Sequence, residues 1–143
     1  MIVCGLPGAG KTTAAMGLQA EHGGVRFSAD EWMQALAINL WDERARGRIE
    51  ALQWTLAQQL LASGVSVIIE WGTWSRSERD ALRVRARELG ARAELHYVTA
   101  PVDVLFERVQ RRRMEDPPMT RDHLEKWAEL FEAPASEELA LYD

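Results

Sequence analysis

This sequence has a single cysteine, and it lacks long apolar runs and an excess of positive charge. Cys4 is the only cysteine in 143 residues, so the chain forms no internal disulfide, as is usual in a reducing compartment. Cys4 lies in a short apolar stretch, and we therefore interpret it as a packing residue.

No apolar run approaches the ~20 residues that a membrane-spanning helix needs. The first residues, MIVCG, carry neither a basic segment nor a cleavage site, so they lack the pattern of a signal peptide. We expect a cytoplasmic protein with no membrane partner.

Acidic residues outnumber basic ones, with 22 Asp and Glu against 17 Lys and Arg and a formal net charge of −5. This balance argues against a protein whose main affinity comes from the phosphate backbone of nucleic acid, although it leaves a local basic groove open. The length, together with 47% hydrophobic and 27% charged residues, fits one globular domain, which we place at residues 1–143.

Short apolar stretches alternate with helical patterns along the chain. The predicted strands are residues 2–4, 25–27, 65–70 and 93–99, and the predicted helices are residues 11–19, a segment starting near residue 30, and residues 42–62, 75–90, 101–113, 120–131 and 136–142. The third strand, VSVIIE, is apolar and β-branched, as in a central parallel strand covered on both faces. This order predicts an α/β fold, a three-layer sandwich around a parallel sheet with strand order 2-3-1-4.

Two of these helices carry further local patterns. In the long third helix Ile49, Leu52, Leu56 and Leu60 recur on one face, which we expect to be buried. The sequence SRSE at residues 75–78 has the spacing of a capping box, which predicts the start of the next helix.

The stretch GLPGAGKT at residues 5–12 fits the phosphate-loop pattern G-x-x-x-x-G-K-[ST] at every fixed position. Glycines let backbone N–H groups point at phosphate oxygens, and the helix that follows directs the positive end of its dipole to the same place. Lys11 supplies a mobile charge for the outer phosphates, and Thr12 offers a hydroxyl to Mg²⁺. We predict a site for ATP and Mg²⁺ whose nucleotide-binding residues include Gly5, Leu6, Pro7, Gly8, Ala9, Gly10, Lys11, Thr12 and Thr13.

Asp30 and Glu31 follow the second strand, at the edge where ligands bind in open α/β sheets. Ser28 and Glu31 have capping-box spacing, which gives Glu31 a structural explanation. Asp30 is then the free carboxylate, and we predict that it takes the proton of an attacking hydroxyl as a general base. The alternative is that Asp30 is only a charge favoured by the dipole at a helix start.

Glu70 closes the third strand beside the phosphate loop. An acidic residue at this place is the second half of a nucleotide–Mg²⁺ site, so we predict a metal-linked or substrate-linked role for Glu70, with Thr12 as the other metal residue. The alternative is a strand-end carboxylate paired with a nearby arginine such as Arg76 or Arg79.

Arginines gather late on the helix that follows the fourth strand. Arg108 and Arg112 are four residues apart and share a face, so one polyphosphate can reach both, and guanidinium groups suit phosphate. We predict that this pair closes over the nucleotide. The alternative is a solvated helix end, with Glu107 and Arg111 as a surface pair.

The loop, the Asp after strand two and the arginine helix together resemble the small P-loop kinases, with a P-loop NTPase fold. The chain looks most similar to a bacterial group of AAA-family ATP-binding proteins and predicted kinases, related to polynucleotide 5′-kinase, chloramphenicol phosphotransferase and the zeta toxins. The matching stretches are GLPGAGKTT, FSADEWM, ALQWTLAQQLLASGVSVIIEWGTWSRSERDALR, LFERVQRRR and LEKWAELFEAPASEELALYD.

This resemblance implies roles for particular residues. Residues 5–12 bind ATP and magnesium, Asp30 takes the general-base position, and Arg108 and Arg112 take the lid position over the phosphates and the adenine. Arg79 resembles an arginine that these kinases carry early in the helix after strand three.

The chain also departs from these kinases. Met33 stands where the polynucleotide kinases carry an arginine, and Glu70 stands where they usually have Asp. A fifth strand is not visible, because residues 118–143 read as helical. The chain is too short to include the helical lid domain of ring-forming ATPases.

Six tryptophans are many for 143 residues. We interpret Trp54 and Trp127 as packing residues. Trp32, Trp71 and Trp74 fall next to the carboxyl ends of strands, where either core packing or the wall of an acceptor pocket would explain them.

The expected mouth of the site is acidic, which predicts a neutral or cationic small molecule as the acceptor and makes nucleic acid an unfavourable partner. The carboxylates that we place there are Asp30, Glu31, Asp42, Glu43 and Glu70.

The sequence therefore predicts an ATP-dependent phosphotransferase that moves the γ-phosphate of ATP to a hydroxyl of a small molecule. Lys11 and Mg²⁺ neutralise the transferred group, Asp30 activates the hydroxyl, and Arg108 and Arg112 close over the nucleotide. Two alternatives stay open: a nucleotide or polynucleotide 5′-kinase, and a non-kinase ATP-binding switch whose slow hydrolysis reports occupancy to a partner protein.

Overall fold

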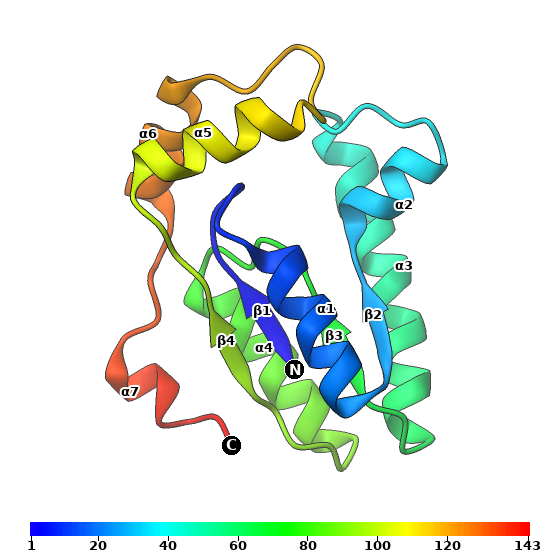
Figure 1. Cartoon of the computed structure of the whole chain (residues 1–143). Coiled ribbons are helices and arrows are strands. Elements are labelled where there is room, and N and C mark those ends of the chain that lie inside the picture. Colours follow the sequence, from blue (N-terminus) through cyan, green and yellow to red (C-terminus); the bar gives the residue numbers. More distant parts are fainter.

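Four short strands form one parallel sheet in the computed structural model, which describes residues 1–143 (Figure 1). The strands are β1 (Ile2–Cys4), β2 (Val25–Phe27), β3 (Val67–Ile69) and β4 (Leu95–Tyr97). The sheet order is β2-β3-β1-β4, so the predicted order 2-3-1-4 is confirmed. The predicted third and fourth strands are too long, because regular pairing is confined to three residues in each strand. No fifth strand is present.

Seven helices surround the sheet, and none of them has both the length and the apolar character required to cross a membrane. They are α1 (Lys11–His22), α2 (Ala29–Ala35), α3 (Glu43–Ala62), α4 (Arg76–Glu88), α5 (Val102–Arg112), α6 (Arg121–Leu130) and α7 (Ser136–Leu139).

Alternate residues of each strand pack on opposite faces of the sheet, which creates the three layers. Ile2 and Ile69 belong to a cluster with side chains of α3 and α4. Val3 and Ile68 pack against Ala15 of α1 on the other face. The three-layer α/β sandwich is therefore confirmed, with α1 on one face and α3 and α4 on the other (Figure 1).

Cys4 is fully buried, in agreement with a packing role, and burial raises the pKa of its thiol to about 11.

A third cluster lies at the carboxyl edge of the sheet. Leu105 and Val109 of α5 pack against Ala9 of the phosphate loop, and Met119 and Leu124 extend this cluster to α6. These contacts place the α5–α6 hairpin over the edge of the sheet at which the phosphate loop lies (Figure 1).

The buried face of α3 agrees with the predicted one only at Ile49, which belongs to the core cluster shared with α4, and at Leu60, which packs against that cluster. Ile49, Gln53 and Ala57 are buried, whereas Leu52 and Leu56 are 53% and 37% exposed. Gln53 is hidden because its side-chain amide satisfies two polar groups: its Nε2 donates to the carbonyl of residue 28 (3.0 Å), and its Oε1 accepts from the indole of residue 71 (2.7 Å). An apolar pattern cannot reveal a buried glutamine.

One of the two predicted capping boxes forms completely. Ser75 and Glu78 cap α4 reciprocally, as predicted. At α2 the hydroxyl of Ser28 accepts from the backbone N–H of Glu31 (3.4 Å), but the Glu31 carboxylate accepts from Arg26 (2.6 Å) and does not return to the helix start. The structural explanation predicted for Glu31 is therefore wrong, because a charged donor is a stronger partner than a backbone N–H.

Candidate active site

The phosphate loop lies so close to its supports that two glycines have no room for a side chain. A Cβ on Gly5 would lie 2.2 Å from the carbonyl oxygen of Val98, and a Cβ on Gly8 would lie 2.7 Å from that of Leu105. Gly8 also has a φ of 80°, which only glycine adopts without strain. The loop is thus held between the end of β4 and α5, ahead of the N-terminus of α1.

Lys11 lies across the loop that it follows. Its Nζ donates to the carbonyl oxygens of Gly5 (2.9 Å) and Leu6 (3.1 Å). Burial lowers the pKa of Lys11 to about 8, and the carboxylates of Asp30 and Glu70 oppose this shift. The two predicted functional carboxylates are therefore close enough to act on the charge of Lys11.

Thr12 and Glu70 are brought together. The hydroxyl of Thr12 donates to Oε1 of Glu70, and Nη1 of Arg26 donates to Oε2 of the same carboxylate. The side chain of Glu70 is only 3% exposed. The alternative that Glu70 pairs with a nearby arginine is therefore confirmed in kind, but the arginine is Arg26 on the neighbouring strand and not Arg76 or Arg79.

The donor atoms at this place fit Mg²⁺ to a limited extent. A hydroxyl and a carboxylate are the oxygen donors that Mg²⁺ prefers, usually together with phosphate oxygens and water. No group of three or more His, Cys, Asp or Glu side chains could hold a metal ion. Thr12 and Glu70 therefore fit an ion held mainly by a nucleotide, and not an ion held by protein alone.

Asp30 lies at the start of α2 and is paired. Nη1 of Arg46 donates to its Oδ1 (2.7 Å), while Nη2 of Arg46 donates to the carbonyl of Leu40 (3.0 Å). The side chain of Asp30 remains 38% exposed. Asp30 is therefore an oriented carboxylate, and not the free one that the sequence predicted. Arg46 was missed because its contact joins α3 to α2 without a local pattern.

The two lid arginines lie differently. Nη1 of Arg108 donates to the loop carbonyls of Gly8 (3.1 Å) and Ala9 (3.2 Å). Arg112 pairs with Glu115 (2.6 Å), and its charge contributes to the lowered pKa of Lys11. Both arginines are thus near the phosphate loop, although Arg108 alone touches it.

Arg79 is bound by other parts of the chain. It is completely buried, and its Nε and Nη2 donate to the carboxylate of Glu138 at 2.6 and 2.9 Å. Its Nη1 donates to the carbonyl of Thr73 (2.9 Å). Arg79 therefore fastens the C-terminal segment to the loop before α4.

Some tryptophans are core residues, and others form a cluster at α6 of the α5–α6 hairpin. Trp71 is buried and Trp32 packs against the same core cluster. Of the two explanations offered for these residues, core packing is therefore the one that the structure supports. Trp127 of α6 contacts Trp74 and Trp41, with ring centroids 5.6 and 6.0 Å apart. These three rings connect the lid with the segments that precede α3 and α4.

Glu50 is a further carboxylate on this side of the molecule that the sequence analysis missed. Burial raises its pKa to about 7, with Arg46 opposing the shift and Glu78, Glu43 and Asp30 adding to it. Its position one turn after Arg46 on α3 was the only available signal.

The predicted acidic mouth is partly neutralised. Arg26 pairs with Glu31 and Glu70, and Arg46 pairs with Asp30 and, at 3.7 Å, with Glu43. With Asp42 and the additional Glu50, carboxylates still outnumber these two arginines.

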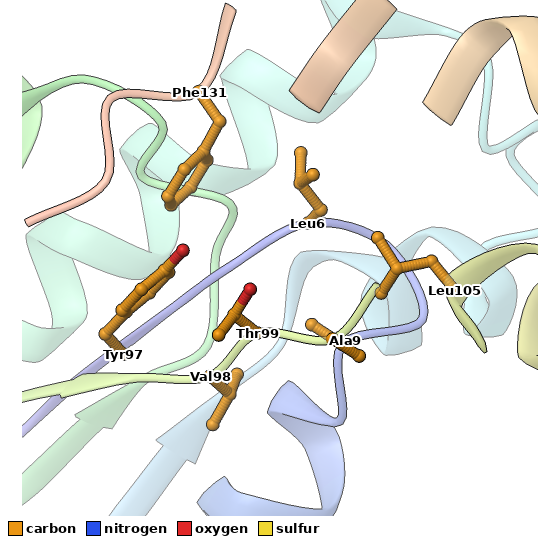
Figure 2. A pocket seen from close by; sticks show the side chains of 8 residues that line it. Leu6, Ala9, Tyr97, Val98, Thr99, Leu105 and Phe131 are labelled. Carbon is orange, nitrogen blue, oxygen red and sulfur yellow. The ribbon is translucent and has the colours of Figure 1, made fainter. Parts of the chain in front are cut away.

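A small apolar hollow lies next to the phosphate loop (Figure 2). Leu6 and Leu105 line one side of it, and the stacked rings of Tyr97 and Phe131, with centroids 5.7 Å apart, line the other. No charged residue lines it.

The fold and the phosphate loop define a P-loop nucleotide-binding domain of the α/β class. Residues 1–134 match the family described as an AAA domain, and the chain belongs to this family. No curated protein matches the sequence.

Solved structures with similar folds include small kinases. A gluconokinase from Sinorhizobium meliloti is 25% identical with a TM-score of 0.64, over 95% of this chain and 76% of that one. A chain of the Pnkp1/Rnl/Hen1 RNA repair complex is 22% identical with a TM-score of 0.73, over 90% of this chain and 42% of that one. Shikimate kinase from Acinetobacter baumannii is 18% identical with a TM-score of 0.54, over 98% and 86%.

Proposed function

We propose that the protein transfers the γ-phosphate of ATP to a hydroxyl group of a small molecule. The observation that carries this proposal is the geometry at the start of α1: Nζ of Lys11 lies on the carbonyls of the phosphate loop, and the hydroxyl of Thr12 donates to Glu70. The carboxylates of Asp30 and Glu70 both favour the charged form of Lys11 and so raise its pKa against the effect of burial. A phosphate-binding lysine between two carboxylates, one beside the Thr12 hydroxyl and one partly exposed, has the parts that phosphoryl transfer to a hydroxyl requires.

The phosphate loop and Lys11 would bind and orient the phosphates. Thr12 and Glu70 would hold Mg²⁺, which when bound neutralises charge on the transferred group. Arg108, already against the loop at Gly8 and Ala9, would cover the phosphates with Arg112 and exclude water.

Asp30 would act as the general base. Arg46 binds its Oδ1, which leaves Oδ2 to accept the proton of the acceptor hydroxyl as that oxygen attacks the γ-phosphorus. In this arrangement Arg46 orients the base and does not touch the acceptor.

The acceptor that we propose is neutral or carries amino groups. The half-buried carboxylate of Glu50 has no hydrogen-bond or ion-pair partner, and the charges that act on it are those of Arg46 and of three carboxylates, Glu78, Glu43 and Asp30. Such a surface repels a polyanion and attracts a cation. Two of the structural neighbours are named as kinases of small molecules, gluconokinase and shikimate kinase.

A polynucleotide 5′-kinase is the second candidate, since a chain of an RNA repair complex shares this fold. Met33 and the excess of carboxylates weigh against it.

A screen of ATP consumption against a panel of hydroxyl compounds and a 5′-hydroxyl oligonucleotide tests both candidates. We expect a neutral or amino-bearing small molecule to stimulate turnover, and the oligonucleotide to leave it at the basal rate. If radiolabelled γ-phosphate is transferred to the oligonucleotide, and this transfer is lost in Asp30→Asn, the protein is a polynucleotide 5′-kinase and not a small-molecule kinase.

A further inference from the structure

Arg26 of β2 joins three elements around the candidate active site. Its Nη1 donates to Glu70 at the end of β3, and its Nη2 donates to Glu31 of α2 at 2.6 Å. The Arg26 side chain is 12% exposed and that of Glu70 is 3% exposed. The guanidinium fork is therefore mostly buried, with one carboxylate on each terminal nitrogen.

These contacts form a continuous series from the phosphate loop to the start of α2. Thr12 donates to Glu70, Glu70 accepts from Arg26, and Arg26 also donates to Glu31. Glu31 directly follows Asp30 in the sequence. One arginine thus connects the carboxylate beside Thr12 with the helix that carries Asp30.

The carboxylate of Glu70 needs such a partner for two reasons. A buried carboxylate without a charged or hydrogen-bonding partner is costly, so it would turn away or become protonated. Glutamate also has one more rotatable bond than aspartate, so its carboxylate is oriented only when both oxygens are bound. Partners of metal-binding side chains commonly orient them in this way.

We infer that Arg26 is a positioning residue for the Mg²⁺-binding part of the site: it holds the Glu70 carboxylate against the Thr12 hydroxyl, in the orientation in which both can bind the ion. This inference rests on the proposed function, because it assumes that the nucleotide binds together with a divalent cation. Lysine is not an equivalent replacement, since its single ammonium group cannot hold two carboxylates in a fixed fork geometry.

A purely structural role is the competing explanation, in which Arg26 only fastens β2 to β3 and α2. The two explanations differ in what they predict for metal binding and for nucleotide binding without metal. A positioning residue affects the first selectively, whereas a structural residue affects both or neither.

The test measures the affinity of the protein·ATP complex for Mn²⁺, a paramagnetic substitute for Mg²⁺. Electron paramagnetic resonance follows this binding as the loss of the free-ion signal. Calorimetry in a chelator gives the affinity for ATP without metal, and thermal unfolding without metal gives the stability. The variants are Arg26→Lys and Glu31→Gln. The matched control is Arg83→Lys, because the Arg83 side chain is similarly buried at 13% exposure and pairs with Asp80 on α4.

We expect Arg26→Lys to weaken Mn²⁺ binding by about 10-fold or more, the usual effect of losing the partner of a metal-binding side chain, and to leave metal-free ATP affinity unchanged. Glu31→Gln removes the negative charge from one arm of the fork while its amide oxygen can still accept from Arg26, so it is expected to weaken Mn²⁺ binding less than Arg26→Lys, but measurably. Arg83→Lys should match the wild type in both affinities.

Wild-type Mn²⁺ affinity in Arg26→Lys, or equal losses of Mn²⁺ and metal-free ATP binding, would overturn the inference. If Arg26→Lys does not fold, Glu31→Gln decides: wild-type Mn²⁺ affinity in this exposed-residue variant would also overturn it. Failure of the wild type to bind Mn²⁺ with ATP would overturn this inference and the proposed function together. Normal Mn²⁺·ATP binding without transfer to any acceptor would contradict the proposed function alone.

Discussion

Lys11 has an unusual acid–base property for a lysine. Burial disfavours the charged form and lowers its pKa from 10.5 to about 8, so the ligand-free protein loses this charge as the pH rises through about 8. The anionic phosphates of ATP would favour the charged form and raise the pKa.

ATP binding should therefore take up protons near pH 8, and the affinity for ATP should fall as the pH rises further. Calorimetry in two buffers of different ionisation enthalpy measures the proton uptake directly. A pH-independent affinity with no proton uptake would show that Lys11 is not the phosphate-binding charge.

Asp30→Asn tests the general base while keeping the shape of the side chain. Arg46 can still donate to the amide oxygen, so we expect an intact fold and nearly unchanged ATP affinity. Transfer should fall by roughly 10²–10⁴-fold, the usual contribution of general acid–base catalysis. A fully active variant, or one that loses ATP binding instead, would make Asp30 a structural or metal-linked residue.

Several partners of the site residues could not be predicted from the sequence. The phosphate loop is contiguous, so its pattern identifies Lys11 and Thr12 directly. Arg26 and Arg46 act through Glu70 and Asp30 across separate elements, and no spacing in the chain encodes these pairs. Contacts that form only on folding are invisible to local patterns.

At the scale of elements, α5 carries Arg108 and Arg112 and ends within three consecutive arginines at residues 111–113. Arg113 terminates α5 in a left-handed conformation with φ of 47°, whereas Arg112 still lies on the helix and contributes to the lowered pKa of Lys11. We expect Arg112→Ala to weaken ATP binding or transfer by about 10-fold, the loss of one charge-assisted hydrogen bond. Arg113→Ala should change either much less, and equal effects in parallel assays would indicate a solvated helix end.

The segment between β3 and α4 contains a strained residue. Thr73 has φ of 42°, which is unfavourable for a β-branched side chain, and its hydroxyl is buried without a partner. Thr73→Gly should raise the free energy of unfolding by about 1 kcal/mol, because glycine adopts this conformation without strain. Denaturant unfolding measures the change, and a destabilised variant would show that packing of the threonine outweighs the strain.

The elements were predictable to different degrees. The capping-box pattern located the start of α4, and the alternation of apolar stretches with helical patterns indicated the parallel sheet. The buried face of α3 was predictable only in part, because Gln53 is buried through hydrogen bonds while Leu52 and Leu56 remain exposed. Side-chain polarity alone does not report a satisfied polar group in a core.

At the scale of the whole molecule, the lid, which is the α5–α6 hairpin, is joined to the segment before α3 on the other side of the site. Asn39 donates to the carbonyl of Asp116 (2.8 Å), and the indole of Trp41 donates to that of Pro117 (2.7 Å). These bonds connect the segment before α3 with the linker between α5 and α6, so the polar site lies between the sheet edge and a bridged lid (Figure 1).

The central claim is that the γ-phosphate of ATP moves to a hydroxyl of a small molecule. Its most direct measurement is the identification of the product by phosphorus NMR and mass spectrometry, after incubation with ATP, Mg²⁺ and the compound that most stimulates ATP turnover. Lys11→Ala, which lacks the phosphate-binding charge, serves as the control. The account predicts a phosphate monoester of that compound, formed by the wild type and absent with Lys11→Ala. Release of inorganic phosphate alone, at the same rate with and without any acceptor, would contradict it.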